Sequence, residues 1–157
     1  IIAECILGNN NEAYKIYKEL IPHNIVKKFG VEKYNAEPYI YSSNIRAPMA
    51  LDAGQAGVSW LSGTASWMMI ALEEYIFGVK PCFAGLKIKP CIPDEWEKAT
   101  VKRYFRGCEY TIEIDNAAAC GNTVKEIYLD GKKFDGEYIL SSTKAASVKV
   151  VMGKRSD

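Results

Sequence analysis

Apolar residues recur at helical spacing over the first twenty residues of the chain. Residues 1–7 are mostly apolar and are followed by Gly8, which predicts the last turns of a helix. A second helix is expected after Asn10 or Asn11 as its cap, with Pro22 just beyond its end. Its apolar positions are Ala13, Ile16, Tyr17 and Leu20. The short turn between the two indicates an antiparallel pair, a building unit of helix bundles and α/α barrels.

The strongest helical pattern begins at Thr64, continues to about Phe77 and ends at Gly78. Apolar side chains three and four positions apart share one side of this helix. They are Trp67, Met68, Ala71, Leu72, Tyr75 and Ile76. Burial requires this spacing, so we interpret Trp67, Met68 and Met69 as core residues and not as contacts to a cofactor.

The residues that open this helix suit an anion. Ser62 is a good N-cap, and the N–H groups of Gly63, Thr64 and Ala65 are expected to point outward at the positive end of the helix dipole. Phosphate fits such a site. The alternative is that Ser62 only caps a buried helix, which is the commoner role of a Ser-Gly-Thr start.

Residues 24–59 lack a regular period and are interrupted by proline and glycine, which predicts a long connection with short ordered pieces. Long ordered loops are often functional. Within it, residues 37–43 combine the Glu37 carboxylate, two tyrosine rings and two serine hydroxyls, a set that suits sugar rings. The alternative is a loop anchored by buried tyrosines. Gln55 is a further amide for a sugar hydroxyl or a loop carbonyl.

Beyond Gly78 the pattern changes to short alternating or β-rich runs. Residues 79–81 and 84–85 are expected to form a linker. Strands are predicted over residues 86–88, 99–105, 108–115, 124–129, 138–140 and 147–152. With hairpin turns at Arg106-Gly107 and Asp130-Gly131, these runs predict an antiparallel β-sandwich. The expected fold is α+β, with a helical domain over residues 1–79 and the sandwich over residues 80–157.

Composition excludes several classes of function. Of the 157 residues 48% are hydrophobic, and twenty basic against nineteen acidic residues leave a charge of +1. This balance gives no basic surface for nucleic acid or an anionic membrane, and the longest apolar run is too short to span a bilayer. Five cysteines without CxxC spacing and a single histidine, His23, suggest neither a zinc cluster nor a disulfide framework. We expect a soluble, cytoplasmic protein without a metal site.

Several ordered motifs lie between residues 37 and 107, within a match that covers nearly the whole chain. They are Glu37-Pro38-Tyr39-Ile40-Tyr41, Trp60-Leu61-Ser62-Gly63-Thr64-Ala65-Ser66-Trp67, Glu74-Tyr75-Ile76-Phe77-Gly78-Val79-Lys80-Pro81, Gly85-Leu86-Lys87-Ile88-Lys89-Pro90-Cys91-Ile92-Pro93 and Phe105-Arg106-Gly107. Together they closely resemble the C-terminal part of glycoside hydrolase family 94, which contains cellobiose, cellodextrin and chitobiose phosphorylases. Because the first helix opens at Ile1 without a cap, we expect this stretch to begin inside a domain of a longer protein.

The resemblance implies an (α/α)6 barrel whose last helices end near Val79, followed by a jelly-roll-like sandwich. It also implies a glycosyltransferase-type phosphorylase. Inorganic phosphate, a co-substrate and not a cofactor, attacks the anomeric carbon of a β-linked oligosaccharide with inversion and gives an α-sugar 1-phosphate. One carboxylic acid then suffices to protonate the leaving oxygen.

The resemblance also implies roles for particular residues. Ser62, Gly63 and Thr64 would bind phosphate, and Glu37 and Gln55 are candidate contacts to sugar or phosphate. The family's acid, an aspartate, and its phosphate-contacting histidine and arginine match nothing here, so we expect them upstream of Ile1 and expect this stretch alone to be inactive. Ser43 stands where several relatives have glutamine, which leaves the sugar open.

Two alternatives remain. The stretch could belong to a cyclic β-1,2-glucan synthase, or it could be a non-catalytic carbohydrate-binding or interaction module. Members of the family are often homodimers, so the resemblance implies a homodimer for the full-length protein, and no segment of this stretch indicates the interface.

Overall fold

The structure is a computed structural model that describes residues 1–153. The chain forms two compact units. One consists of Ile1–Tyr14 together with the chain from Ala71 onward, and the other of Lys15–Ile70. Helices and strands are both present, so the predicted α+β class is confirmed. In the described residues, no helix has the length and apolar character that a membrane span requires.

The first two predicted helices are present as α1 (Ile2–Leu7) and α2 (Asn10–Leu20). Gly8 ends α1 with φ +83°, and its N–H is donated to carbonyls of the last turn, as expected for a left-handed helix end. The backbone cap of α2 is Asn9, whose carbonyl accepts from Ala13 N–H, and not Asn10 or Asn11. The side chains of Asn10 and Asn11 bind Asp94 instead.

Pro22 lies just beyond the end of α2, as predicted, but helical structure continues after it. It opens α3 (Pro22–Phe29), because a proline lacks only an N–H that the first helical turn leaves unpaired in any case. A single turn, α4 (Val31–Tyr34), follows. The sequence prediction missed both elements and placed the long connection too early.

Residues 35–63 form the predicted connection with short ordered pieces. The chain doubles back through hydrogen bonds such as Ser43 N–H to the Val58 carbonyl at 2.9 Å and Arg46 N–H to the Gln55 carbonyl at 2.9 Å. Tyr34 is 1% exposed and donates its hydroxyl to the Ile40 carbonyl at 2.8 Å. A buried tyrosine therefore anchors this loop, but it lies before residues 37–43, whose own tyrosines were the expected anchors.

The helix predicted from Thr64 to Phe77 is present, but it changes type halfway. The α-helix α5 (Thr64–Ile70) continues into the π-helix η1 (Ala71–Ile76), and Phe77 N–H donates to the Leu72 carbonyl five residues earlier. Gly78 ends it with φ +66°. Met68 is buried as predicted, but Trp67 and Met69 are 64% and 55% exposed. The prediction that these two are core residues is wrong for this chain, because no part of residues 1–153 covers them.

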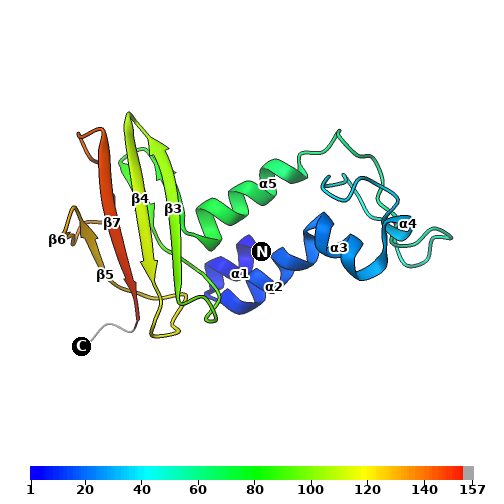
Figure 1. Cartoon of the computed structure of the whole chain (residues 1–157), viewed down its shortest axis with the longest axis horizontal. Coiled ribbons are helices and arrows are strands. Elements are labelled where there is room, and N and C mark those ends of the chain that lie inside the picture. Colours follow the sequence, from blue (N-terminus) through cyan, green and yellow to red (C-terminus); the bar gives the residue numbers. More distant parts are fainter. Residues whose placement is uncertain (154–157) are drawn as a thin grey trace. The chain divides into compact units, whose positions relative to one another are not determined.

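The β structure consists of two sheets, which Figure 1 shows within the first unit. The small sheet pairs β1 (Val79–Cys82) with β2 (Gly85–Ile88). The larger sheet has the order β3-β4-β7-β5-β6. Its strands are β3 (Lys98–Phe105), β4 (Cys108–Asp115), β5 (Val124–Leu129), β6 (Lys132–Lys133) and β7 (Ala145–Met152).

The larger sheet is mixed, so the prediction of a purely antiparallel sandwich is wrong. β4 pairs in parallel with β7, and Ile112 lies opposite Val148. Parallel neighbours need a long crossover, which residues 116–144 provide. Two local predictions also fail. Residues 79–81 form strand β1 and not a linker, whereas the stretch 138–140 contributes only the isolated bridge of Ile139 to Leu86.

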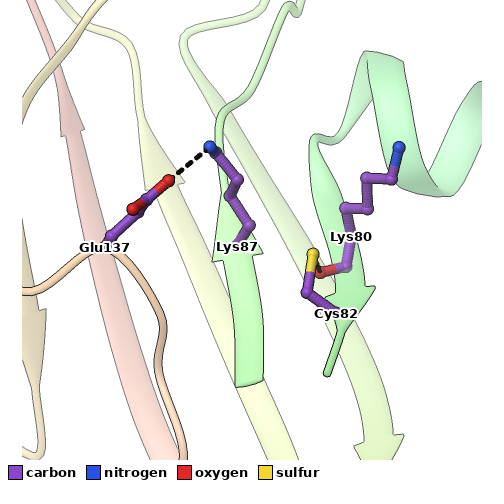
Figure 2. A network of polar contacts seen from close by, with 4 residues as sticks. All are labelled: Lys80, Cys82, Lys87 and Glu137. Atoms are coloured by element: carbon purple, nitrogen blue, oxygen red, sulfur yellow. Dashed lines mark hydrogen bonds and ion pairs between the residues drawn. The ribbon is translucent and has the colours of Figure 1, made fainter. Parts of the chain in front are cut away.

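Alternation along β4 and β7 builds the core of the first unit. Tyr110, Ile112 and Ile114 on β4 are at most 1% exposed, and so are Val148 and Val150 on β7. The bridge to Ile139 is flanked by an ion pair between Lys87 on β2 and Glu137 at 2.7 Å, which Figure 2 shows beside Lys80 and Cys82 of β1. Both partners of this pair are largely exposed, so it contributes little to stability.

Candidate functional site

The start of α5 is held by a network of hydroxyl groups. Ser62 Oγ accepts the N–H of Thr64 at 3.0 Å and lies 2.6 Å from Thr64 Oγ1. The Gly63 carbonyl accepts the first intrahelical bond, from Trp67 N–H at 3.1 Å. Ser62 therefore caps the helix from one position before the backbone cap, and the Thr64 N–H that the sequence suggested would be open is already bonded.

The hydroxyls of Ser62 and Thr64 also contact residues 37–43, the other segment that the sequence predicted to bind a ligand. Thr64 Oγ1 donates to the Ser42 carbonyl at 3.2 Å, and Ser62 Oγ lies 3.3 Å from the same oxygen. Ser62 and Thr64 are both half-buried. One carbonyl thus joins the helix start to the end of the 37–43 segment, 22 positions away in sequence.

A second contact joins these segments. The indole Nε1 of Trp60 donates to Glu37 Oε1 at 2.8 Å. This bond lowers the pKa of Glu37 below its ordinary value, with smaller contributions from the backbone N–H of Glu37 and from Ser59. We use the term loop junction for Glu37, Ser42, Trp60, Ser62 and Thr64.

The tyrosines of the 37–43 segment differ in their surroundings. Burial first, and then the neighbouring Tyr17, raise the pKa of Tyr41 to about 12. Tyr39 is 69% exposed. Tyr41 therefore anchors the segment to α2, while the ring of Tyr39 is open to a ligand.

Gln55 is not part of the loop junction. Its Oε1 accepts a weak bond from Asn35 Nδ2 at 3.5 Å, and its carbonyl accepts from Arg46 N–H. Among residues 1–153 no hydrogen bond connects Gln55 to Glu37, Ser62 or Thr64. The loop junction thus contains three of the five predicted site residues, Glu37, Ser62 and Thr64, and Gly63 lies between the last two. It adds Trp60 and Ser42, which the sequence prediction included in its candidate segments but not among its site residues.

Comparison with known proteins identifies the family of the chain. The family described as "Glycosyl hydrolase 94 superfamily, catalytic domain" matches residues 1–78. Solabiose phosphorylase from Paenibacillus borealis is 34% identical over 139 residues, which are 87% of this chain and 18% of that protein. N,N'-diacetylchitobiose phosphorylase from Vibrio proteolyticus is 38% identical over 135 residues, 86% of this chain and 17% of that protein.

More distant similarities extend beyond these phosphorylases. The cyclic β-(1,2)-glucan synthase NdvB of Rhizobium meliloti is 28% identical over 117 residues, 74% of this chain and 4% of that protein. Among solved structures, a family GH92 α-mannosidase from Bacteroides thetaiotaomicron aligns with a TM-score of 0.43 and 24% identity, covering 67% of this chain and 14% of that one. The chain spans less than a fifth of the two phosphorylases, and it belongs to the glycosyl hydrolase 94 superfamily.

Proposed function

We propose that this chain is the C-terminal part of an inverting glycoside phosphorylase. The enzyme uses inorganic phosphate to cleave a β-linked disaccharide or oligosaccharide and releases an α-sugar 1-phosphate. The observation that carries the proposal is the identity of 34% and 38% to two named phosphorylases over more than four fifths of this chain. The loop junction supports it, since it joins a carboxylate next to an exposed tyrosine to a hydroxyl-rich helix start.

In this proposal Ser62, Gly63 and Thr64 bind the phosphate. The Thr64 hydroxyl now donates to the Ser42 carbonyl. Rotation about one side-chain bond would redirect that proton to a phosphate oxygen, which is a stronger acceptor because it is charged. The Thr64 N–H is bonded to Ser62 Oγ, but the N–H groups of Ala65 and Ser66 have no intrahelical acceptor, and the helix dipole behind them adds to the attraction.

Glu37 has the properties of a sugar ligand and not of the acid. A general acid needs a raised pKa so that it is protonated at neutral pH. The indole bond shifts the pKa of Glu37 in the opposite direction. Its carboxylate therefore accepts a bond from a sugar hydroxyl, and the acid, an aspartate, comes from the part of the protein outside this chain. Gln55 remains a weaker proposal for a substrate contact, because its bond is to Asn35.

The fold of the whole protein follows from the same proposal. The helices of this chain are the last helices of an (α/α)6 barrel, and the β strands belong to a sandwich that is jelly-roll-like apart from the parallel pairing of β4 with β7. The exposed faces of Trp67 and Met69 support this, since large apolar side chains grouped on one helix are the kind that further barrel helices cover.

The test is an assay of the full-length protein on a panel of β-linked disaccharides, with solabiose and N,N'-diacetylchitobiose among them. Each is incubated with and without phosphate, and sugar 1-phosphate is detected by ³¹P NMR, which also distinguishes the anomers. A phosphate-dependent α-product supports the proposal. Absence of any sugar 1-phosphate across the panel contradicts it.

The similarity to NdvB favours a second candidate, a module of a cyclic β-1,2-glucan synthase. In that case the full-length protein would be far longer and would make cyclic glucan. A third candidate, a non-catalytic carbohydrate-binding or interaction module, predicts saccharide binding that is independent of phosphate. Isothermal titration of the same disaccharides, with and without phosphate, separates it from the enzyme.

A further inference from the structure

Trp60 has an unusual backbone conformation for a large residue. Its φ is +65°, in the left-handed region that residues with a Cβ seldom adopt. Such a conformation persists where surrounding contacts hold it, and it is found preferentially at functional sites. Burial does not explain it, because Trp60 is 67% exposed.

The contact that holds Trp60 is directional. An indole N–H can only donate, and here it donates to Glu37 Oε1 at 2.8 Å. Ser42 fixes the two segments to each other at a separate point, through Thr64 at 3.2 Å. The carboxylate of Glu37 is therefore held from outside its own segment, and its orientation depends on the Trp60 backbone.

We propose that Trp60 is a positioning residue whose indole N–H orients the Glu37 carboxylate toward a hydroxyl of a bound pyranose. The inference rests on the proposed phosphorylase function and adds a residue to it. A carboxylate has about four lone-pair positions, so the bonds from Trp60, Ser59 and the backbone N–H of Glu37 leave acceptor capacity for one sugar hydroxyl. The ligand class is a pyranose, one hydroxyl of which donates to the position of the carboxylate that remains open.

The test compares Trp60→Phe, Glu37→Gln and the double variant in the full-length protein. Trp60→Phe keeps an aromatic ring and removes the donor. We expect the KM for the sugar to rise by about tenfold while the KM for phosphate stays within about twofold, as for loss of one bond that orients a charged group. In the double variant the second change should add little, because both act through the same carboxylate.

Two further readouts distinguish positioning from a loss of folding. In Trp60→Phe the acid limb of kcat/KM for the sugar should move to higher pH, because the pKa of Glu37 rises when its donor is lost. In protein labelled with 5-fluorotryptophan, the ¹⁹F signal that Trp60→Phe removes should shift with pH in the acid range, and Glu37→Gln should abolish that shift. This signal needs no substrate.

The outcomes separate the two proposals. If the unsubstituted protein makes no sugar 1-phosphate, the proposed function fails and this inference fails with it. If the unsubstituted protein is active and Trp60→Phe leaves the sugar KM and the pH profile unchanged, only the role of Trp60 is overturned. An equal rise in the KM values for sugar and phosphate likewise overturns it, since that result means general disruption of the loop junction.

Discussion

Asn10 and Asp94 are hydrogen-bonded across 84 positions of sequence, Asn10 Nδ2 donating to Asp94 Oδ1 at 2.7 Å. Asn11 Nδ2 donates to the other carboxylate oxygen at 2.8 Å, and Gly121 N–H donates to Oδ1 at 3.1 Å. Asn10 uses its second N–H on the Ile92 carbonyl. The start of α2, the turn at Asp94 and the turn at Gly121 are thus fixed by one carboxylate.

Replacement of Asp94 should loosen this part of the first unit. Asp94→Ala leaves three donors without their acceptor, so we expect local stability to fall by about 1–3 kcal/mol. Hydrogen exchange of the peptide that contains Gly121 in the full-length protein measures the change, at about tenfold faster exchange per 1.4 kcal/mol. Glu113→Gln, at an exposed position of β4, is the control and should leave exchange unchanged.

Acid should loosen the same contacts. Burial alone would raise the pKa of Asp94, but the bonds from Asn11, Asn10 and Gly121 lower it below the ordinary 3.8. A carboxylate with a lowered pKa in the folded state stabilises the fold above its unfolded pKa, and the effect is lost as pH falls through the folded value. In the unsubstituted protein, hydrogen-exchange protection of the Gly121 peptide, corrected for intrinsic exchange, should therefore decline below about pH 4. In Asp94→Ala the same protection should not change with pH in that range. Equal pH dependence in both proteins would contradict this.

Gly78, which ends η1, can be compared with Gly107, a glycine of similar backbone conformation. Both have positive φ, +66° and +83°. A Cβ on Gly78 would lie 1.9 Å from the Lys89 carbonyl oxygen, whereas a Cβ on Gly107 would meet nothing within 4 Å. We expect Gly107→Ala to cost about 1–2 kcal/mol from backbone strain alone, and Gly78→Ala to cost clearly more because a backbone group must move. Thermal unfolding of the full-length variants tests the order, and equal melting temperatures would contradict it.

Local sequence patterns predicted most of the helices and strands, because nearby residues determine where these elements form and end. Alternation of Tyr110, Ile112 and Ile114 with polar residues fits one strand facing a core, and β4 has the predicted bounds. Gly78 ends the long helix at the predicted place. The predicted family is also confirmed. It could be predicted because each motif that carried the resemblance is contiguous in sequence.

The failures concern relationships between distant residues. The sequences of β4 and β7 do not indicate that Ile112 pairs in parallel with Val148, because the alternation of apolar and polar residues is the same for parallel and antiparallel neighbours. The Trp60 to Glu37 bond was missed for a similar reason. It depends on a positive φ at a tryptophan, which no residue preference indicates. The π-helix of η1 likewise leaves no periodic signal within six residues.

The five cysteines should differ in reactivity. Cys5, Cys91 and Cys108 are at most 6% exposed, whereas Cys82 and Cys120 are half-buried. Contact with Cys5, and then burial, raise the pKa of the Cys91 thiol, which lowers its thiolate fraction. Brief treatment of the full-length protein with iodoacetamide near pH 8, followed by peptide mass spectrometry, should show alkylation at Cys82 and Cys120 well before the other three. Early alkylation of Cys91 would mean that this part of the core opens readily.

Substitution of Thr64 is the most direct test of the phosphate proposal. In the full-length enzyme Thr64→Ala should raise the apparent KM for phosphate or lower kcat by about tenfold or more, since one charge-assisted bond of about 1.5–3 kcal/mol is lost. Thr64→Ser keeps the hydroxyl that now donates to Ser42 and should stay close to the unsubstituted enzyme. Thr100→Ala, at an exposed position of β3, is the control. If Thr64→Ala lowers thermal stability while phosphate dependence is unchanged, the hydroxyl serves only the capping network with Ser62, and phosphate must bind through other groups.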